Sequence, residues 1–480
     1  MEHKNKWTIL FTVVIMTFMG TLDSSIVNVA LPVMNKELGT TMSTIEWIVT
    51  SYLITVCAVI LPFGKIGDTK GKTKVFKLGI IIFTLGSLMC GFAKDINFLI
   101  FARVVQAIGA AGTMSTNQGI VTESFPPNER GRALGMIGTF VALGTMVGPS
   151  LGGIIVSVLK WNYIFLINIP IGIIAFLISL KTLPNEVSKD NIPLDYKGTV
   201  LFILVITLLF GSIMLGQQYS YANIYIILSL LISIVLFLFF VKFEVKQEYP
   251  LLDISIFKNK LFTVSIICGF TSFIAISGTN IILPFYLQDA MKLSPGLTGI
   301  LMTVSPIVLG ILAPISGYLS DKFESEKITF IGLAVMTIGL LLMSTLKVNS
   351  PIWVIAIFLA TTSAGSAMFQ SPNNSLIMST VEKDKLGIAG SINSLVRNLG
   401  MISGIALSTT LLYSKMSNKM GYKVLGYVEG REDVFSYGMK SVYIVVTIIC
   451  LIGAILTLMR LLNKSKTEEP KQKREKLLCK

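Results

Sequence analysis

Apolar runs long enough to cross a lipid bilayer recur along almost the whole chain. A helix needs about 20 residues to cross roughly 30 Å of hydrocarbon. Inside hydrocarbon every backbone polar group must find a partner within its own segment, so each apolar run is predicted to be a helix. The 480-residue sequence therefore predicts an all-α membrane protein with fourteen spans, at residues 7–32, 44–66, 74–94, 97–120, 133–158, 162–182, 198–217, 223–243, 261–287, 296–320, 327–347, 351–373, 386–412 and 440–462.

Charged residues are scarce and lie mainly between these runs. They make up 14% of the chain, against 53% hydrophobic residues, and the formal net charge is +14. An even number of spans puts both chain ends on one side, and most of the 40 Lys and Arg residues share that side. Cytoplasmic segments carry such an excess, so both termini are predicted to be cytoplasmic, and the basic balance does not indicate nucleic acid. The first run lacks a small-residue cleavage site and is predicted to be a retained helix.

The fifth run carries residues that weaken a helix near its middle. Gly144, Gly148, Gly152 and Gly153 leave parts of its surface without side chains, and Pro149 removes a backbone donor. Such a helix can bend and lets a neighbouring backbone come close. The spacing resembles the antiporter signature of the fifth helix in drug/proton antiporters of the major facilitator superfamily. The alternative is a helix that only packs tightly through small residues.

Two sequence features repeat between the halves of the chain. Residues 64–74, the loop after the second span, have a counterpart in residues 317–327, the loop after the tenth. Gly144 and Gly148 have counterparts at nearly the same offset in Gly400 and Gly404. Two parallel six-helix halves are the internal symmetry of major facilitator transporters, and the spans at 198–243 interrupt the offset like an insertion. We therefore predict two six-helix major facilitator bundles plus two inserted central helices, with regions at 1–182 (N-terminal bundle), 183–260 (linker with the inserted helices), 261–462 (C-terminal bundle) and 463–480 (basic cytoplasmic tail).

Further motifs extend the resemblance over nearly the whole chain. Residues 22–32 resemble the first-helix motif of fourteen-span drug/proton antiporters, and residues 103–109 resemble their fourth-helix motif, with Ala107 where glycine is usual. Residues 64–74 resemble the family's Gly-x-x-x-Asp-x-x-Gly loop, with Lys70 and Lys72 at positions where arginine is usual. The combined match resembles the branch of quaternary-ammonium and multidrug exporters, and it implies a bacterial cytoplasmic membrane protein.

The resemblance also implies a cytoplasmic gate around the loop at 64–74. Asp68 is expected to face a helix N-terminus or an arginine such as Arg130 or Arg132. The alternative is a solvated loop whose lysines only set the topology. The expected gate residues are Gly64, Asp68, Gly71, Lys72, Lys74 and, from the second half, Asp321.

Coupling to a proton gradient needs an ionisable side chain within the membrane, and few exist here. The single histidine, His3, precedes the first span, and among the acids Asp23 alone lies well inside a span. Glu46 and Glu123 lie near span ends, where an interfacial anchor is the plain interpretation and a coupling or substrate role the alternative. At 1.5 Å per residue Asp23 lies roughly 13 Å deep and Arg103 roughly 9 Å. The resemblance implies that their helices are neighbours, so we predict a proton-coupling pair, with a static pair that only fixes helix packing as the alternative.

The resemblance implies that spans one, two, five, nine and ten line a central cavity. Aromatic faces near a carboxylate suit lipophilic cations, although each such side chain can also serve only in packing or face lipid. The tenth span has no acid, where some exporters of divalent cations carry one, so monovalent cations or neutral compounds are expected. The predicted substrate surface consists of Asn28, Glu46, Trp47, Tyr52, Gln106, Phe270, Phe273, Asn280 and Tyr286, with Phe285 and Met302 beside them.

Two features of the C-terminal half leave alternatives open. Arg397 lies near the middle of the thirteenth span, where no acid of that half has a similar depth. An unpaired cation there is costly, so we expect carbonyls, water or a partner across the interface to bind it. Its Arg-x-x-Gly pattern resembles that of thirteenth helices and favours a structural role over substrate binding. Residues 413–439 form the longest predicted outer loop, in which residues 421–427 are expected to form a hairpin, a cap or a mobile tether.

Together these patterns predict a proton-coupled antiporter that exports amphipathic drugs and antiseptics by alternating access. Its expected partners are a small-molecule substrate, protons and membrane lipid, with no nucleic acid, and we expect a monomer. No cofactor is expected beyond the proton gradient, and no metal-ligand cluster, Walker loop or nucleophile constellation suggests an enzyme. The alternatives are an exporter of lipids or lipid-linked molecules and, from another class, a membrane receptor or scaffold that does not transport.

Overall fold

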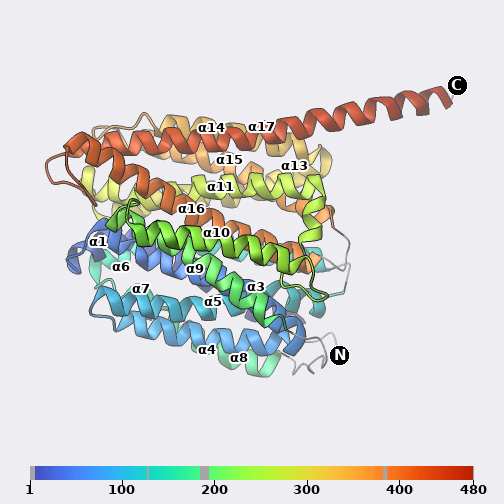
Figure 1. Ribbon diagram of the computed structural model, residues 1–480, viewed down its shortest axis with the longest axis horizontal. Coiled ribbons are helices and arrows are strands. Elements are labelled where there is room, and N and C mark those ends of the chain that lie inside the picture. Colours follow the sequence, from blue (N-terminus) through green and yellow to red (C-terminus); the bar gives the residue numbers. More distant parts are fainter. Residues whose placement is uncertain (1–5, 127–128, 184–193, 382–385, 479–480) are drawn as a thin grey trace.

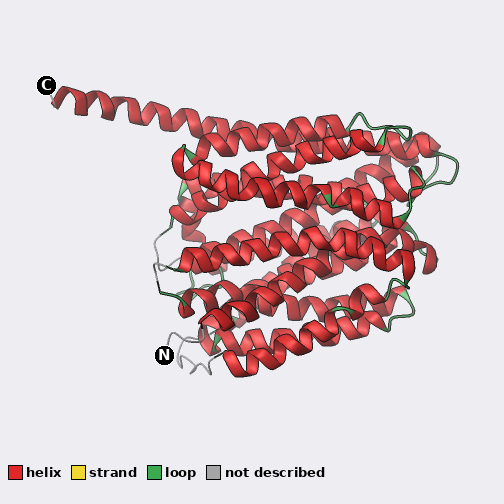
Figure 2. Cartoon of the chain, turned by 180° about the vertical axis from the view of Figure 1, so that it is seen from behind, coloured by secondary structure: helices red, strands yellow, loops and turns green. Residues whose placement is uncertain are grey.

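The chain folds into a bundle of long helices that lie side by side. The computed structural model describes residues 6–126, 129–183, 194–381 and 386–478, and no strand occurs within these ranges. Figure 1 and Figure 2 show the helices running between two ends of the bundle. The described chain begins and ends at the same end (Figure 1), which we call the terminal end, and we call the other the distal end. The all-α prediction is confirmed.

Each of the fourteen predicted spans coincides with a helical segment. Thirteen segments among the described residues are long and apolar enough to cross a membrane, and α6 contributes a further apolar stretch, Leu143–Val158. The first group of helices is α1 (Lys6–Glu37), α2 (Met42–Ile45), α3 (Trp47–Lys70), α4 (Lys72–Gly91), α5 (Ile96–Ser124), α6 (Arg130–Val158), α7 (Tyr163–Leu166) and α8 (Asn168–Thr182). The inserted pair is α9 (Tyr196–Tyr219) and α10 (Ile224–Glu244). After the short helix η2 (Ile254–Lys258), the second group is α11 (Lys260–Phe285), η3 (Tyr286–Ala290), α12 (Pro295–Met302), α13 (Val304–Lys322), α14 (Ser325–Met343), α15 (Ile352–Ser379), α16 (Leu386–Met420) and α17 (Glu432–Leu478).

Several spans are interrupted by a single residue outside the α-helices or by a change of helix type. The second span breaks at Glu46, between α2 and α3, and the sixth breaks at Ile167. The ninth ends in η3, a single π-helical turn that follows Pro284. Such breaks are tolerated at membrane depth only where protein surrounds them, and π-helical turns often mark functional positions. The breaks at Glu46 and η3 both lie toward the distal end.

The distal loop near the C-terminus is shorter than the sequence predicted. Helix α16 continues to Met420 and α17 begins at Glu432, so most of the predicted loop at 413–439 is helical. Apolarity marks only the part of a helix inside hydrocarbon, and a polar sequence can extend the helix beyond it. The remaining loop, 421–431, contains no strand, so a hairpin is excluded there. It packs on the first group, where the Ser43 amide donates to the Leu425 carbonyl.

Close helix crossings repeat between the two groups. A Cβ added to Gly109 of α5 would overlap the Phe83 amide of α4, and one added to Gly365 of α15 would overlap the Met336 amide of α14. The crossing of α1 and α6 also has a counterpart, in the crossing of α11 and α16. Gly148 packs against Ser25 in the first pair, and Gly404 packs against Ser277 in the second. The repeat read from the sequence is therefore also a repeat of packing geometry.

The inserted helices lie along the boundary of the two groups. Helix α9 contacts α10 and also both α3 and α16, so it touches each group. Helix α10 exposes a largely apolar surface that includes Leu231, Val235 and Leu238. Such a surface is the kind that faces lipid chains rather than water.

Candidate functional site

A fully buried ion pair lies within the first helix group. Asp23 of α1 and Arg103 of α5 have side-chain exposures of 0% and 1%. Arg103 Nη1 donates to Asp23 Oδ2 at 2.6 Å. The sequence predicted that these two charges lie at a similar depth, and in the structure they are in direct contact. A charge-assisted hydrogen bond of this length is among the strong interactions available in a protein interior.

Two amide side chains complete the contacts of the Asp23 carboxylate. Gln106 Nε2 donates to Asp23 Oδ1 at 2.9 Å, and Asn168 Nδ2 donates to the same oxygen at 2.8 Å. Gln106 also accepts from Arg103 at 2.6 Å and donates to Ser87 Oγ at 2.8 Å. Since all five side chains are buried, a change of charge at Asp23 alters a network that joins α1, α4, α5 and α8. We call this set the Asp23 network.

Arg103 also ties the Asp23 network to the second span. Its Nε donates to the Ile48 carbonyl at 3.0 Å, in the first turn of α3. Its guanidinium carbon lies 4.2 Å from the centre of the Tyr52 ring and 5.6 Å from that of Phe165. Cation–π contact of this kind stabilises a buried guanidinium. Tyr52, predicted as a substrate contact, therefore packs on the arginine of the ion pair.

The glycine motif of α6 brings a second helix beside the ion pair. Cβ atoms at Gly144 and Gly148 would overlap Thr21 and Ser25 of α1, and the Ser25 hydroxyl donates to the Gly144 carbonyl at 3.2 Å. On another side of α6, a Cβ at Gly153 would lie 3.2 Å from the Cα of Gly299 in α12. The motif helix thus contacts the helix that carries Asp23 and also the second helix group. Gly152, against Ile26, belongs to the α1 contact, and Pro149 is buried with its carbonyl facing Gly299 of α12.

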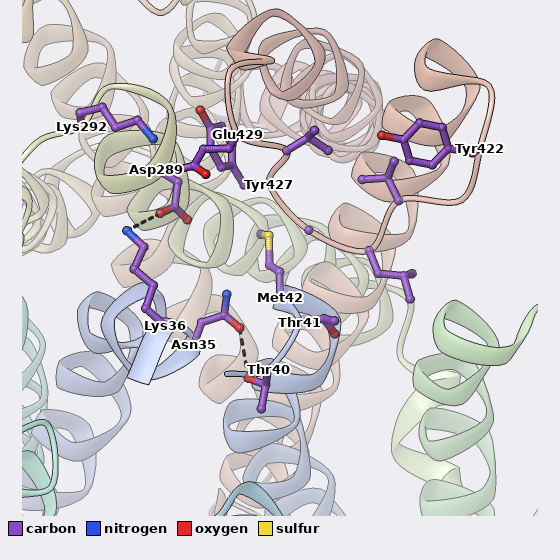
Figure 3. Close-up of a pocket in the computed structure, with 14 residues that line it drawn as sticks. Asn35, Lys36, Thr40, Thr41, Met42, Asp289, Lys292, Tyr422, Tyr427 and Glu429 are labelled. Carbon is purple, nitrogen blue, oxygen red and sulfur yellow. Dashed lines mark hydrogen bonds and ion pairs between the residues drawn. The ribbon is translucent and has the colours of Figure 1, made fainter. Parts of the chain in front are cut away.

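At the distal end the two helix groups are joined by polar contacts. Gln288 of η3 donates to the Val29 carbonyl at 3.0 Å, and Lys36 forms an ion pair with Asp289 at 3.0 Å. The Tyr413 hydroxyl of α16 donates to Glu46. A cavity of about 440 Å³ opens beside these contacts (Figure 3). It is lined by the end of α1, the turn before α2, η3 and the loop 421–431, and none of its lining residues belongs to the Asp23 network.

The other predicted substrate residues are distributed over both groups. Asn28, Trp47, Phe270, Phe273 and Asn280 are half-buried. Phe270 and Phe273 lie against Gly400, on the crossing of α11 and α16. Tyr286 differs, because it is fully buried and its hydroxyl donates to the Lys347 carbonyl at 2.7 Å, within its own group. Phe285 and Met302 are buried as well.

The predicted gate loop forms ion pairs at the terminal end. Lys72 Nζ lies 3.1 Å from Asp68 and 2.5 Å from Glu123 of α5. Gly71 has φ of +107°, a conformation that side chains rarely adopt, and Gly67 packs on Thr116 while Gly64 faces Ser115. Lys74 is exposed. The side chains of Arg130, Arg132 and Asp321 lie outside the described residues. The expected contact between Asp68 and an arginine therefore stays a prediction.

Arg397 lies half-buried on α16 without a partner among the described side chains. No hydrogen bond or ion pair to it occurs within the ranges that the structure describes. Its neighbour Asn398 is buried and donates to the Ser394 carbonyl at 2.8 Å. Among these described residues, neither the expected carbonyl nor a cross-interface partner of Arg397 is therefore seen.

Sequence reasoning missed three residues that the structure brings into these sites. Asn168 and Ser87 join the Asp23 network, and Tyr413 binds Glu46. Asn168 carries a detectable signal, because an amide inside the apolar run Asn168–Thr182 needs a buried partner. Ser87 carries no such signal, since a serine hydroxyl in a span often binds its own helix backbone. Tyr413 carries none either, because it lies at the end of a predicted span, where tyrosine is common.

Comparison with known proteins adds a family to this geometry. The sequence profile of the Major Facilitator Superfamily matches residues 13–405 and 265–478. Riboflavin transporter RibZ of Clostridioides difficile is 37% identical over 465 residues, which cover 96% of this chain and 99% of that protein. Multidrug transporter protein MdtP of Bacillus subtilis is 28% identical over 428 residues, 89% of this chain and 79% of that protein. A solved bacterial homologue of the human lysosomal transporter Spinster, inward-facing and unoccupied, has a TM-score of 0.66 at 15% identity and covers 96% of this chain and 97% of its own, which shows the shared fold.

Proposed function

This chain belongs to the major facilitator superfamily, and on that basis we propose that it is a proton-coupled antiporter that exports amphipathic monovalent cations or neutral molecules. One observation carries the proposal. Asp23, an ionisable acid, lies fully buried among membrane-spanning helices and in contact with Arg103. Ionisable groups in such positions are costly to keep and mark proton or substrate pathways.

The contacts of Asp23 suggest how a proton changes the bundle. Arg103, Gln106 and Asn168 all donate to its carboxylate, an arrangement that suits the ionised form. A proton on Asp23 removes the counter-charge of Arg103, and a buried cation left without its partner is strongly unfavourable. Protonation therefore favours a second arrangement of α1 and α5, in which water or a carbonyl reaches the guanidinium. Two such arrangements are what alternating access requires.

The relatives suggest two kinds of substrate. MdtP is described as a multidrug transporter, which agrees with export of amphipathic drugs and antiseptics. RibZ, at 37% identity over 96% of this chain, is described as a riboflavin transporter. Riboflavin transport is therefore a second candidate function. Both candidates use the same fold and the same Asp23 network, so direct transport measurements must separate them.

We further propose an orientation and a state for the structure. With both termini cytoplasmic, the distal end faces outward, and the contacts that join the helix groups there close the outer side in this state. The protein acts as a monomer in the bacterial cytoplasmic membrane, with lipid against the apolar surface of α10. It needs no cofactor beyond the proton gradient.

Transport by purified protein in proteoliposomes tests these proposals. Under an imposed pH gradient, we expect movement of ethidium or of riboflavin, and the comparison identifies the substrate class. Asp23→Asn should abolish movement driven by the gradient. Glu37→Gln serves as the matched control, because Glu37 is an exposed carboxyl at the end of the same helix. Gradient-driven transport at the wild-type rate by Asp23→Asn would overturn the proposal.

A further inference from the structure

A second fully buried acid, Glu46, lies where the two helix groups meet. It occupies the break between α2 and α3, toward the distal end, and its exposure is 0%. The short helix before the break, α2, begins after Thr41, whose hydroxyl accepts from the Thr44 amide and caps it. The backbone ladder is kept across the break, because the Glu46 amide donates to the Met42 carbonyl. The side chain, and not the backbone, is therefore the unusual feature of this position.

The hydrogen-bond partner of Glu46 belongs to the other helix group. The hydroxyl of Tyr413, itself 4% exposed on α16, donates to Glu46 Oε1. The second carboxyl oxygen, Oε2, is buried without a hydrogen bond. Glu46 and Tyr413 are 367 positions apart in the sequence, so this contact exists only while the groups meet at the distal end.

No cation of the described residues neutralises Glu46. Of the groups that face it from α3 and α16, Tyr413 is the titratable one, and Thr409 of α16 contributes only a hydroxyl. Two lysines of the distal surface bind elsewhere: Lys36 pairs with Asp289, and Lys423 donates to the Gln218 carbonyl. An ionised carboxylate that is buried with one neutral donor is strongly disfavoured, whereas the neutral acid fits the same space.

The inserted helix α9 seals this contact from the side. Gln217 Nε2 donates to the Ala406 carbonyl at 3.1 Å, to Thr409 Oγ1 at 2.9 Å and to Thr410 Oγ1 at 2.8 Å, all on α16. The next residue, Gln218, donates to Thr44 Oγ1 of α2 at 3.3 Å. Helix α9 thus holds α16 and α2 together beside Glu46, and water is kept away from the carboxyl.

We propose that Glu46 is a second proton-binding site, which takes up a proton from the distal side as the two helix groups close there and returns it to that side as they open. The proton adds to one carboxylate oxygen of Glu46 when Tyr413 closes over the group. It leaves to water when α16 moves away and the carboxyl is hydrated. This proton is not carried across the membrane, so the site sets how easily the distal end closes at a given distal pH. The role in a transport cycle rests on the function proposed above, whereas proton binding at closure does not depend on it.

The test measures distal opening directly and not transport. Spin labels are placed at Lys160 and Asn349, exposed positions at the distal end of the two groups, in full-length protein without other reactive cysteines in lipid nanodiscs. The distance between them is measured by pulsed electron resonance as a function of pH. Wild type should close in acid and open as the pH rises. Glu46→Gln should not open as the pH rises, because the amide still accepts from Tyr413 and cannot ionise.

Two further variants make every outcome informative. Tyr413→Phe removes the hydrogen bond of the closed state. The midpoint of closing should therefore need an about fivefold higher proton concentration, which is the effect of one hydrogen bond of typical strength. The shifted midpoint in Tyr413→Phe tests the proposal even if Glu46→Gln does not fold. Asp23→Asn should lose gradient-driven transport yet keep the distal pH response. If the wild-type protein shows no proton-coupled transport but its distal pH response is still lost in Glu46→Gln, the proposed function is overturned and the second proton-binding site is not. A wild-type pH response in Glu46→Gln, or an unchanged midpoint in Tyr413→Phe, would overturn the second proton-binding site.

Discussion

Adding one methyl group at Gly148 is expected to push α1 and α6 apart beside Asp23. The new Cβ would lie 2.8 Å from Ser25 Cβ and 3.0 Å from the Ile26 amide nitrogen, and it would overlap Ser25 Oγ. The hydroxyl can rotate away, although its bond to the Gly144 carbonyl is then lost. Ser25 Cβ and the Ile26 nitrogen move only with the helix. Because ordinary Cβ contacts begin at 3.4 Å, the shortfall of 0.6 Å at Ser25 Cβ must be met by displacing α1 from α6.

The size of the effect follows from the position of Ser25, two residues from Asp23. Overpacking of this kind costs about 1–3 kcal/mol. A displacement of half an ångström would carry the 2.6 Å bond between Arg103 and Asp23 toward the long end of the normal range. If about 1.4 kcal/mol is lost from the productive arrangement, the population that supports transport falls about tenfold. We therefore expect Gly148→Ala to lower the transport rate about tenfold and to lower the apparent melting temperature.

A glycine in another helix provides a control that separates the steric effect at Gly148 from the general effect of replacing a helical glycine by alanine. A Cβ at Gly211 of α9 meets nothing within 4 Å, so Gly211→Ala adds the same methyl group without a contact. Alanine in a helix interior is more favourable than glycine by up to about 1 kcal/mol, and this variant should transport and melt like wild type or slightly better. Rates are measured in proteoliposomes under an imposed pH gradient, and melting by thermal shift in detergent. Equal behaviour of the two variants would refute the argument.

Two other substitutions test the contacts on either side of this crossing. Asn168→Ala removes one of the donors to Asp23 Oδ1, and because hydrogen bonds to charged groups are strong, gradient-driven transport should fall about tenfold; a wild-type rate would remove Asn168 from the coupling network. Lys36→Ala and Asp289→Asn break an ion pair whose lysine is 66% exposed, so each should open the distal end only slightly, and less so at high salt. A double-mutant cycle on the spin-label distances that gives no coupling between these two residues would show that the pair does not hold the distal end.

The number and approximate position of the helices were predictable because the bilayer imposes them. Hydrocarbon thickness fixes the length of an apolar run, and the backbone must be helical there. The ends of the last two helices were not predictable in the same way. Residues 413–420 and 432–439 are polar enough to leave hydrocarbon, yet nothing in water forces a helix to stop, and both segments remain helical. The errors therefore lie outside the membrane, where the constraint no longer applies.

The candidate site was predictable where charge marked it. Asp23 and Arg103 stand out as ionisable residues in apolar runs, and their similar depth suggested a contact that the structure contains. The hydroxyl partners were not predictable, because Ser87 does not differ in the sequence from a serine that binds its own helix, and Tyr413 does not differ from other tyrosines at the ends of spans. The contact between Glu46 and Tyr413 also depends on how the two helix groups are placed in one state. Local sequence patterns contain no information on that placement.

Helix α6 connects the Asp23 network to the boundary of the two helix groups. On one side Gly144, Gly148 and Gly152 leave no space between α6 and α1, so a shift of α1 when Asp23 changes charge must move α6 as well. On the other side Gly153 meets Gly299 of α12 at the boundary of the groups, backbone against backbone. Tight packing without flexible side chains transmits displacement with little loss. A change at Asp23 therefore reaches the boundary of the two groups through one helix, and the glycines are needed because any larger side chain would separate the surfaces that transmit it.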